Sequence, residues 1–268
     1  MDADWRVADS ELAMAQELVR IEISGPVAVL TLARPGRRNT LSGAMIRALR
    51  SALEDVGSAR VVVLAADGRV FCSGHDLSEM AGLDEVGYRA VFEECTGLMD
   101  AIQRIPQPVI AEVGGLATAA GCQLALSCDL VVCSEAAGFA TPGVKIGLFC
   151  TTPMVALTRA IGRKRAMEML LTGRVVGARE AAEWGMVNRV VEAGALRAAT
   201  LELAEQVAAA SAYTVALGKR AFYAQVDLEQ GCAYTLAKET MTGNALADDA
   251  QEGMAAFLGK RRAVWKGQ

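Results

Sequence analysis

The 268-residue sequence has one histidine, 5% aromatic residues and no apolar run near the roughly 18 residues of a membrane-spanning helix. A single histidine and seven cysteines without a Cys-x-x-Cys pair lack the ligand spacing of a zinc site. The odd cysteine count indicates reduced, mostly buried thiols in a reducing compartment. We therefore expect no metal site, no membrane span and a cytoplasmic location.

An excess of basic charge is also missing. The 27 Lys and Arg residues against 31 Asp and Glu residues give a net charge of −4, so nucleic acid is not an expected partner. Residues 1–9 include acidic residues and no apolar stretch, so neither a secretory signal nor an Arg-rich transit peptide is expected. The 53% hydrophobic and 22% charged residues favour a large packed core over disorder.

Strand and helix patterns alternate through the first part of the chain. Val61–Ala66 is a continuous apolar run, typical of a strand covered on both faces, and residues 21–33 predict two strands around a Gly-Pro turn. Further patterns predict helices at 43–56, 84–104 and 153–161, and strands at 109–113, 129–133 and 186–191. From Arg163 onward the pattern is almost entirely helical, which predicts an α/β core followed by a helical segment.

Two loops rich in small residues are candidates for binding. Residues 71–80 (FCSGHDLSEM) follow the predicted strand 61–66, and residues 114–123 (GGLATAAGCQ) lie between a strand and a helix. Small residues let a ligand approach the backbone, and a helix N-terminus offers free N–H groups. Together the loops could aim two N–H groups at one carbonyl oxygen and stabilise a thioester enolate. Each loop by itself is more often only a structural turn, because small-residue turns between a strand and a helix are common.

An ordered set of motifs resembles the enoyl-CoA hydratase/isomerase (crotonase) superfamily from about residue 21 to the end. The motifs are Arg34-Pro35, Asn39-Thr40-Leu41, SGHDL (73–77), AGCQLALSCD (120–129), FATPGVKIGL (139–148), LTG (171–173), AREA (178–181), WGMV (184–187) and FLGKR (257–261). Within the superfamily, FCSGHDL, ATPGV and GLFCTTP are most similar to the enoyl-CoA hydratase domain-containing protein 3 group.

The resemblance implies an α/β fold, a crotonase-like (ClpP/crotonase) β-β-α spiral core with a C-terminal helical trimerisation region. It divides the chain into an N-terminal extension (1–20), the spiral core (21–200) and the helical region (201–268). The implied partners are an acyl-CoA or enoyl-CoA substrate and further copies of the chain, in a homotrimer or a dimer of trimers. No separate cofactor is expected, because coenzyme A is part of the substrate.

The resemblance also assigns roles to the two loops. The backbone N–H groups of His75 and Ala120 match the two oxyanion donors, and alanine replaces the family's glycine at 120, which a negative φ would tolerate. Ser73, His75 and Leu77 match the stretch that contacts coenzyme A. Asp76 belongs to the same binding loop and is expected to hold its shape.

Positions near both ends of the chain match those that approach the coenzyme A nucleotide in the family. Phe257 and Lys260 match C-terminal positions that approach the nucleotide, in the family often from a neighbouring subunit, although a solvated basic tail would look the same. Gly36 stands where the family has a basic residue, so Arg37 or Arg38 would have to replace it.

The two glutamates of a family hydratase are missing. The first position is Gln123, whose amide cannot act as a general base, and the second is Gly143. Gln123 could still orient a water molecule or a substrate oxygen, or simply satisfy backbone groups. Other residues could supply acid–base chemistry from segments that flank the site: Glu79, Glu94, Cys150 and Thr151.

Two functions remain compatible with this pattern. One is an enzyme that stabilises a thioester enolate but hydrates enoyl-CoA poorly, because it lacks two acid–base groups that each contribute about 10²–10⁴ in rate. Decarboxylation or isomerisation of a CoA ester would remain as its reaction. The other is a catalytically silent acyl-CoA-binding oligomer. A nucleotide-binding Rossmann enzyme is weakly supported, because residues 114–121 lack the G-x-G-x-x-G order.

Overall fold

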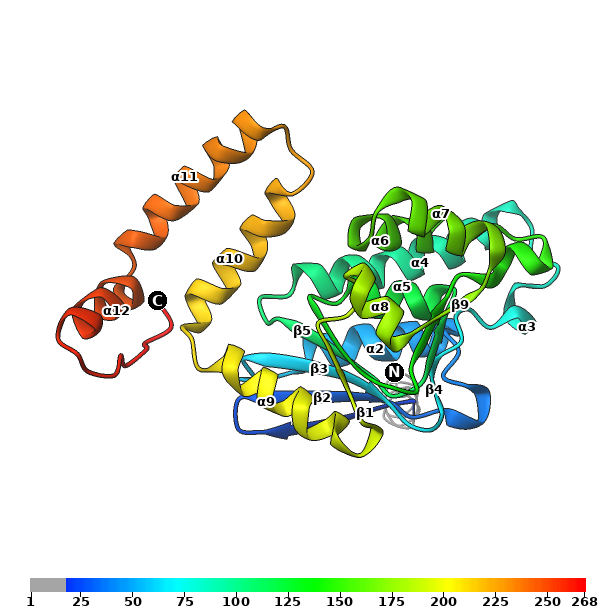
Figure 1. Ribbon diagram of the computed structural model, residues 1–268, viewed down its shortest axis with the longest axis horizontal. Coiled ribbons are helices and arrows are strands. Elements are labelled where there is room, and N and C mark those ends of the chain that lie inside the picture. Colours follow the sequence, from blue (N-terminus) through cyan, green and yellow to red (C-terminus); the bar gives the residue numbers. More distant parts are fainter. Residues whose placement is uncertain (1–17) are drawn as a thin grey trace, which may run out of the picture.

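Two β-sheets form the centre of the protein, and the computed structural model describes residues 18–268 (Figure 1). The larger sheet has the order β1 (Val19–Ser24), β2 (Val27–Leu32), β3 (Val61–Ala66), β5 (Val109–Val113), β7 (Leu130–Ser134) and β10 (Arg189–Val191). The smaller sheet has the order β4 (Val70–Cys72), β6 (Leu116–Thr118), β8 (Gly138–Ala140) and β9 (Val175–Gly177). Strands β1 and β9 pair antiparallel with β2 and β8, and the inner pairs are parallel.

The chain runs repeatedly from the larger sheet to the smaller sheet and then into a helix. β3 leads to β4 and α3 (Leu77–Met80), β5 leads to β6 and α5 (Ala120–Ser127), and β7 leads to β8 and then α6 (Pro153–Ala160). This path confirms the predicted β-β-α spiral. Because β4, β6 and β8 are parallel neighbours, the loops that follow them lie side by side at one edge of the smaller sheet.

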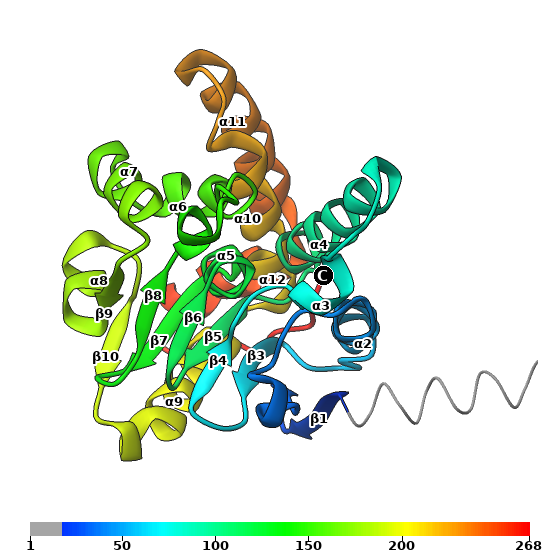
Figure 2. The same cartoon turned by 90° about the vertical axis from the view of Figure 1, so that its right-hand side faces the viewer.

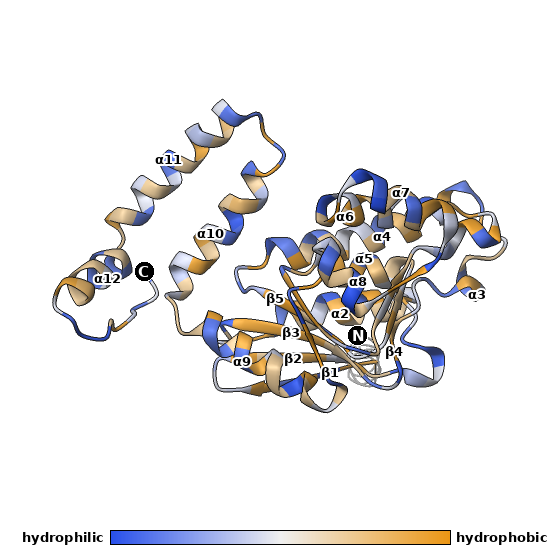
Figure 3. Ribbon diagram, in the orientation of Figure 1, coloured by the Kyte–Doolittle hydropathy of each residue, from blue (hydrophilic) through white to orange (hydrophobic). Residues whose placement is uncertain are grey.

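The alternation along β3 divides the core into two layers. Val62 and Leu64 belong to the larger hydrophobic cluster, while Val61 and Val63 face a second cluster that includes α9 (Leu196–Ala208). Burial on both faces explains why this strand is a continuous apolar run, and the larger sheet contains the most hydrophobic ribbons in Figure 3. Figure 2 shows α9 on one side of the sheets and α4, α5 and α6 on the other.

The remaining elements surround this core. Ser42 caps helix α2 (Gly43–Glu54) at its predicted start, because its side chain accepts a hydrogen bond from the Met45 N–H at 3.2 Å. The helices and 3-10 turns are α2 (Gly43–Glu54), α4 (Glu85–Arg104), α7 (Arg163–Thr172), α8 (Ala178–Trp184), η1 (Pro35–Arg37), η2 (Pro142–Ile146) and η3 (Ala193–Ala195). The strands of the smaller sheet escaped prediction, since three residues are too few to establish an alternating pattern.

The last three helices form an arm that extends from the body (Figure 1). They are α10 (Ala212–Gln225), α11 (Gln230–Leu246) and α12 (Asp248–Leu258). Lys219 anchors α10, because its buried Nζ is paired with Asp129 at 2.8 Å and donates to the carbonyl of Gln107 at 2.8 Å. The predicted boundary after residue 200 falls inside α9, which packs on the larger sheet, so the arm begins after that helix.

Within residues 18–268, no helix has both the length and the apolar character that crossing a bilayer requires.

Candidate functional site

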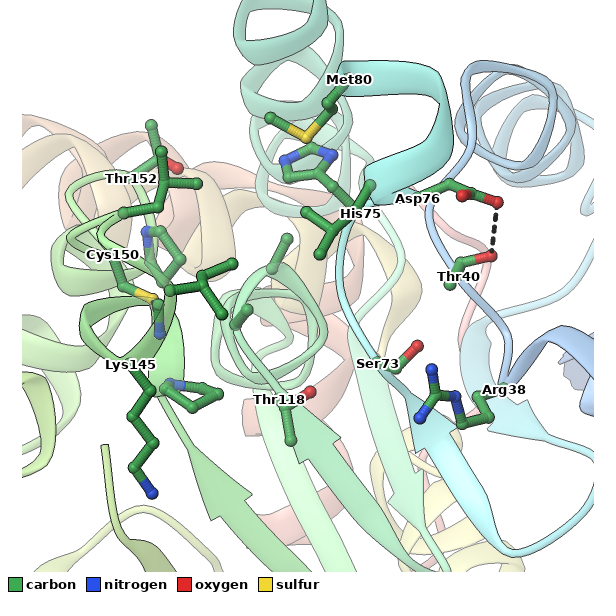
Figure 4. Close-up of a pocket in the computed structure, with 18 of the residues that line it drawn as sticks. Arg38, Thr40, Ser73, His75, Asp76, Met80, Thr118, Lys145, Cys150 and Thr152 are labelled. Carbon is green, nitrogen blue, oxygen red and sulfur yellow. Dashed lines mark hydrogen bonds between the residues drawn. The ribbon is translucent and has the colours of Figure 1, made fainter. Parts of the chain in front are cut away.

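A cavity of about 750 Å³ opens where the loops after β4, β6 and β8 meet (Figure 4). Both loops singled out from the sequence contribute to its wall, so segments about 45 residues apart along the chain are brought together. The lining consists of residues 36–38, 40, 73, 75–78, 80, 118–120, 142, 143, 145, 146 and 148–153, together with Phe92 of α4.

The loop after β4 touches the start of α5 directly. Gly74 has φ +84°, a conformation that favours glycine, and a β-carbon added to it would lie 3.0 Å from the Ala119 β-carbon and 3.1 Å from the Ala120 nitrogen. Its carbonyl accepts a hydrogen bond from the Leu41 N–H at 2.8 Å. The residue before His75 is therefore packed against the residue that begins α5.

The loop after β6 turns sharply into α5. Ala119 adopts φ 51° and ψ −121°, a conformation in which alanine is strained by about 1–3 kcal/mol. Its N–H donates to the Ala140 carbonyl at 2.9 Å, which fixes the turn against β8. The strain falls on Ala119, and Ala120 itself is helical, so the alanine that replaces the family's glycine meets the condition of a negative φ.

His75 and Ala120 both line the same cavity. Within residues 18–268, the backbone N–H of neither residue donates to a backbone acceptor. The first turn of a helix leaves its N–H groups without intrahelical partners, which explains the free donor at Ala120. The structure thus brings together the two amides that the sequence singled out.

Asp76 holds the loop that carries His75. Its carboxylate accepts hydrogen bonds from the Ser78 hydroxyl at 2.6 Å, the Ser78 N–H at 3.1 Å and the Arg37 guanidinium at 2.8 Å. The hydrogen bond from the Ser78 hydroxyl, followed by that from Arg37, lowers the pKa of Asp76 to about 2. With these bonds satisfied, Asp76 stays ionised and shapes the loop.

Asp76 should therefore make stability depend on acid. A carboxyl whose pKa is depressed on folding stabilises the protein above its ordinary pKa and loses that contribution as pH falls toward the folded value. We expect Asp76→Asn to cost about 1–2 kcal/mol at pH 7, with the difference from wild type shrinking between pH 4 and pH 2. Urea denaturation across this pH range measures it, and a difference independent of pH would contradict the assignment.

Asn39 organises the loop between β2 and α2, and the sequence indicated it only as part of the Asn39-Thr40-Leu41 motif. It is fully buried at φ 50°, and its side-chain NH₂ donates to the carbonyls of Asp67 at 3.0 Å and Val70 at 2.9 Å. Its Oδ1 accepts from the Arg34 N–H at 2.9 Å. Asparagine tolerates the left-handed conformation and supplies donors and an acceptor together, which explains the residue type.

Asn39→Asp should be strongly destabilising. The carboxylate keeps the acceptor but removes both donors, leaves two carbonyls unpaired and buries a charge, so we expect a loss of about 3 kcal/mol. Chemical denaturation at pH 7 measures this change. A loss below 1 kcal/mol would show that the loop does not depend on these bonds.

A family described as enoyl-CoA hydratase/isomerase matches residues 22–268 of this chain. The chain belongs to this family. The family match confirms the resemblance to the crotonase superfamily and supports an enzyme of the lyase or isomerase type. The matched residues span both the core and the arm.

Similar proteins place this family member in the enoyl-CoA hydratase domain-containing protein 3 group, as predicted. Human enoyl-CoA hydratase domain-containing protein 3, mitochondrial, is 45% identical over 240 residues, 88% of this chain and 79% of that protein. The crystal structure of the human protein matches with a TM-score of 0.89 and 44% identity over 92% of this chain and all of that chain. An enoyl-CoA hydratase from Mycobacterium smegmatis gives a TM-score of 0.90 and 47% identity over 92% and 98%.

The expected cytoplasmic location is contradicted by this comparison. The relatives from mouse, rat and human are named mitochondrial proteins. The prediction failed because buried, reduced cysteines indicate only a reducing environment, which does not distinguish one such compartment from another.

The positions of the two family glutamates differ from each other in this family member. Gln123 is 4% exposed and lies off the cavity wall, with its Oε1 unpaired among the described residues. Gly143 lies in the wall, but a β-carbon there would be 2.0 Å from the Leu148 carbonyl oxygen and 2.9 Å from the Cys150 sulfur. The turn after η2 therefore fills the space that a side chain at 143 would need.

The coenzyme A positions inferred from the family divide into two groups. Ser73 and Leu77 line the cavity; the buried hydroxyl of Ser73 has no hydrogen-bond partner among residues 18–268, and Leu77 is 52% exposed. Phe257 and Lys260 are absent from the lining, and Phe257 is 83% exposed near the end of the arm. One chain therefore brings together the first pair and leaves the second pair outside the cavity.

Of the four other acid–base candidates proposed from the sequence, the two glutamates lie outside the cavity. Glu79 and Glu94 line a smaller adjacent hollow, where Glu79 accepts from the Gly43 N–H at 3.0 Å and Glu94 pairs with Arg47 at 3.0 Å. The remaining two candidates, Cys150 and Thr151, do line the cavity. Burial raises the pKa of the Cys150 thiol, so it is protonated at neutral pH.

Proposed function

We propose that this protein binds the thioester of an acyl-CoA or enoyl-CoA in the 750 Å³ cavity and stabilises its enolate with the N–H groups of His75 and Ala120. The observation that carries the proposal is that His75 and Ala120 line one cavity and that, among residues 18–268, neither backbone N–H donates to a backbone acceptor. Membership of the enoyl-CoA hydratase/isomerase family supports a CoA thioester as the ligand.

Ordinary hydration is not the reaction we propose. An amide at 123 has no basic group, and the crowded backbone at 143 excludes a carboxylate. The carboxylate that does line the cavity belongs to Asp76, which already accepts several hydrogen bonds. No free carboxylate among the described lining residues could activate water or protonate the α-carbon. Isomerisation and decarboxylation need no attacking water, so they fit this cavity better than hydration does.

Two cations at the cavity suit the phosphates of coenzyme A. Arg38 and Lys145 lie on opposite sides of the cavity in Figure 4, and neither has a carboxylate partner within 4 Å among residues 18–268. Arg37 is different, since it is paired with Asp76 at 2.8 Å. We therefore assign to Arg38 the role of the basic residue that Gly36 lacks.

Arg38→Ala should weaken coenzyme A binding about tenfold, by loss of one charge-assisted contact. Isothermal titration calorimetry with free coenzyme A at two salt concentrations measures the effect, which high salt should reduce. Arg104→Ala, on the exposed end of α4, is the matched control and should bind as wild type does. Equal affinities for the two variants would contradict the role of Arg38.

The arm favours an oligomer, and we propose the trimer or dimer of trimers that the resemblance implies. Large apolar side chains stay exposed along it in the single chain, among them Tyr234, Met241, Leu246, Phe257 and Leu258. A neighbouring arm would bring Phe257 and Lys260 to the coenzyme A site. Light scattering on the purified protein tests this, and a monomer at micromolar concentration would overturn it.

A conjugated acyl-CoA chromophore tests the function directly. Two donors on the thioester oxygen polarise the conjugated carbonyl, so bound chromophore should absorb at longer wavelength than free chromophore. Turnover of crotonyl-CoA, a 3-enoyl-CoA and a malonyl-type CoA ester then separates hydration, isomerisation and decarboxylation. Binding without a wavelength shift would refute the thioester site.

The catalytically silent alternative keeps one specific support, the commitment of Asp76 to its own loop. It predicts a wavelength shift on binding but no turnover of any CoA ester. The same two measurements therefore distinguish a silent acyl-CoA-binding protein from an enzyme.

A further inference from the structure

Residues 261–268 turn back along α12, the helix that precedes them (Figure 1). The carboxylate of Glu252 accepts hydrogen bonds from the Val264 N–H at 2.9 Å and from the Arg261 guanidinium at 2.6 Å and 2.8 Å. Asp249 lies three residues before Glu252 and hence on the same face of the helix. These two carboxylates give the returning segment its partners on α12.

Asp249 also ties this segment to the junction between α9 and α10. It is 1% exposed, and its carboxylate accepts hydrogen bonds from the backbone N–H groups of Lys266 at 2.6 Å and Gly267 at 3.0 Å. A third hydrogen bond comes from the hydroxyl of Ser211, the N-cap residue of α10, at 2.5 Å. A buried carboxylate is stable only with such donors, so one side chain joins α10, α12 and the returning segment. We call this set of contacts around Asp249 the clasp.

A tryptophan makes a second tie to the same junction. The indole Nε1–H of Trp265 donates to the carbonyl of Ala209, which directly follows α9, at 2.8 Å. Apolar packing does little to hold α12, since the buried residues of this helix are Asp249 and Ala256. The position of α12 on the arm therefore depends on the clasp and on Trp265 more than on a hydrophobic core.

The clasp closes a turn that carries Lys260. This residue has φ 50°, a left-handed conformation that a lysine adopts where contacts on both sides impose it. On the helix side, the Arg261 N–H donates to the Ala256 carbonyl at 3.0 Å, and beyond Arg261 the clasp holds the segment to the junction. Lys260 has no carboxylate within 4 Å among the described residues, and Phe257 is 83% exposed. Both side chains are thus presented outward from a fixed turn.

We infer that Asp249 is a positioning residue for coenzyme A binding, because its clasp fixes the turn from which Phe257 and Lys260 reach a neighbouring copy. This rests on the proposed function, in which a neighbouring arm supplies these two residues. Asp249 itself touches no ligand. A lysine on a fixed turn loses less conformational freedom on binding a phosphate than one on a loose turn, so the clasp strengthens binding by preorganisation. The lining of the thioester cavity ends at residue 153, so opening the clasp leaves that cavity intact.

Asp249→Asn tests the clasp, because it keeps the shape of the side chain but puts an NH₂ group, which cannot accept, in place of one carboxylate oxygen. In the full chain, amide exchange with D₂O in the peptide covering residues 263–268, followed by mass spectrometry, should become about 10–100-fold faster. Trp265→Phe removes one neutral hydrogen bond and should accelerate exchange less. Asp248→Asn is the matched control, since the Asp248 side chain is 60% exposed and lies 3.6 Å from the Lys266 Nζ. Equal exchange in Asp249→Asn and Asp248→Asn would show that the clasp does not exist.

Coenzyme A affinity shows whether the clasp acts through Lys260. In isothermal titration calorimetry with free coenzyme A, Asp249→Asn should bind about tenfold more weakly than wild type, as Lys260→Ala should. The double variant should bind no more weakly than either single variant, since both changes remove the same contact. The chromophore shift at saturating ligand should stay at the wild-type value, which also shows that the variants are folded. Additive losses, or an Asp249→Asn affinity equal to that of Asp248→Asn, would overturn the positioning role.

Two further outcomes separate this inference from the proposed thioester function. Wild-type coenzyme A affinity in Lys260→Ala would remove the neighbour's contribution and with it the role of Asp249, while a chromophore shift would leave the thioester site standing. A wild-type protein that binds without any chromophore shift, but loses affinity equally in Lys260→Ala and Asp249→Asn, would refute the thioester function and uphold the clasp.

Discussion

Ala120→Pro should lose the enolate-stabilising ability of the site by about 10²–10³-fold, because proline has no N–H to donate to the thioester oxygen. Ala120 is the first residue of α5, where a helix tolerates proline because that N–H has no intrahelical partner. The variant thus removes one hydrogen-bond donor and retains the helix.

Two readouts test the Ala120→Pro prediction. The red shift of the bound chromophore should shrink, and turnover of any CoA ester that wild type accepts should fall by the stated factor. Ala212→Pro is the matched control, since Ala212 is the first residue of α10, on the arm, and the preceding Ser211 has φ −59° and ψ 125°. If Ala120→Pro binds, shifts and turns over as the control does, the second donor does not exist.

Gly121→Ala should damage both stability and the site. A β-carbon at 121 would lie 2.1 Å from the Cys72 carbonyl oxygen and 2.6 Å from its carbonyl carbon, and this backbone cannot yield as a flexible side chain would. Cys72 directly precedes the loop that carries His75, so relief of the clash must separate the two amides. We expect a loss of about 3 kcal/mol or more in the free energy of unfolding.

The measurements for Gly121→Ala are urea denaturation and the chromophore shift on the same preparation. Gly162→Ala is the control, because Gly162 also lies at the start of a helix, with φ −64° and nothing within 4 Å of an added β-carbon. The control should change stability by less than about 1 kcal/mol. A Gly121→Ala protein with wild-type stability and wild-type shift would show that the contact with Cys72 does not hold the loops together.

The spiral core could be predicted where the pattern was long. Val61–Ala66 is buried on both faces, so its apolar run is unambiguous, and the hydroxyl of Ser42 caps α2 at the expected residue. The three-residue strands of the smaller sheet were missed, because partners far along the chain hold them in place and no local pattern does. The predicted boundary after residue 200 falls inside α9, because a helix pattern does not reveal that the helix packs on the sheet.

The candidate site divides in the same way between local sequence and tertiary contact. The sequence alone singled out the two small-residue loops and showed that His75 is the single histidine. That Gln123 and Gly143 stand where glutamates are expected is what the resemblance to the family implies.

Only the tertiary structure decided which of these groups meet. Whether the amides of His75 and Ala120 reach one cavity, whether the carboxylate of Asp76 is free and whether a side chain fits at Gly143 depend on contacts between strands and loops distant in sequence. The unpaired Nε2 of His75 likewise results from what surrounds the ring. Such contacts depend on packing distances of a few tenths of an ångström, and neither residue order nor periodicity encodes these in a form that can be read locally.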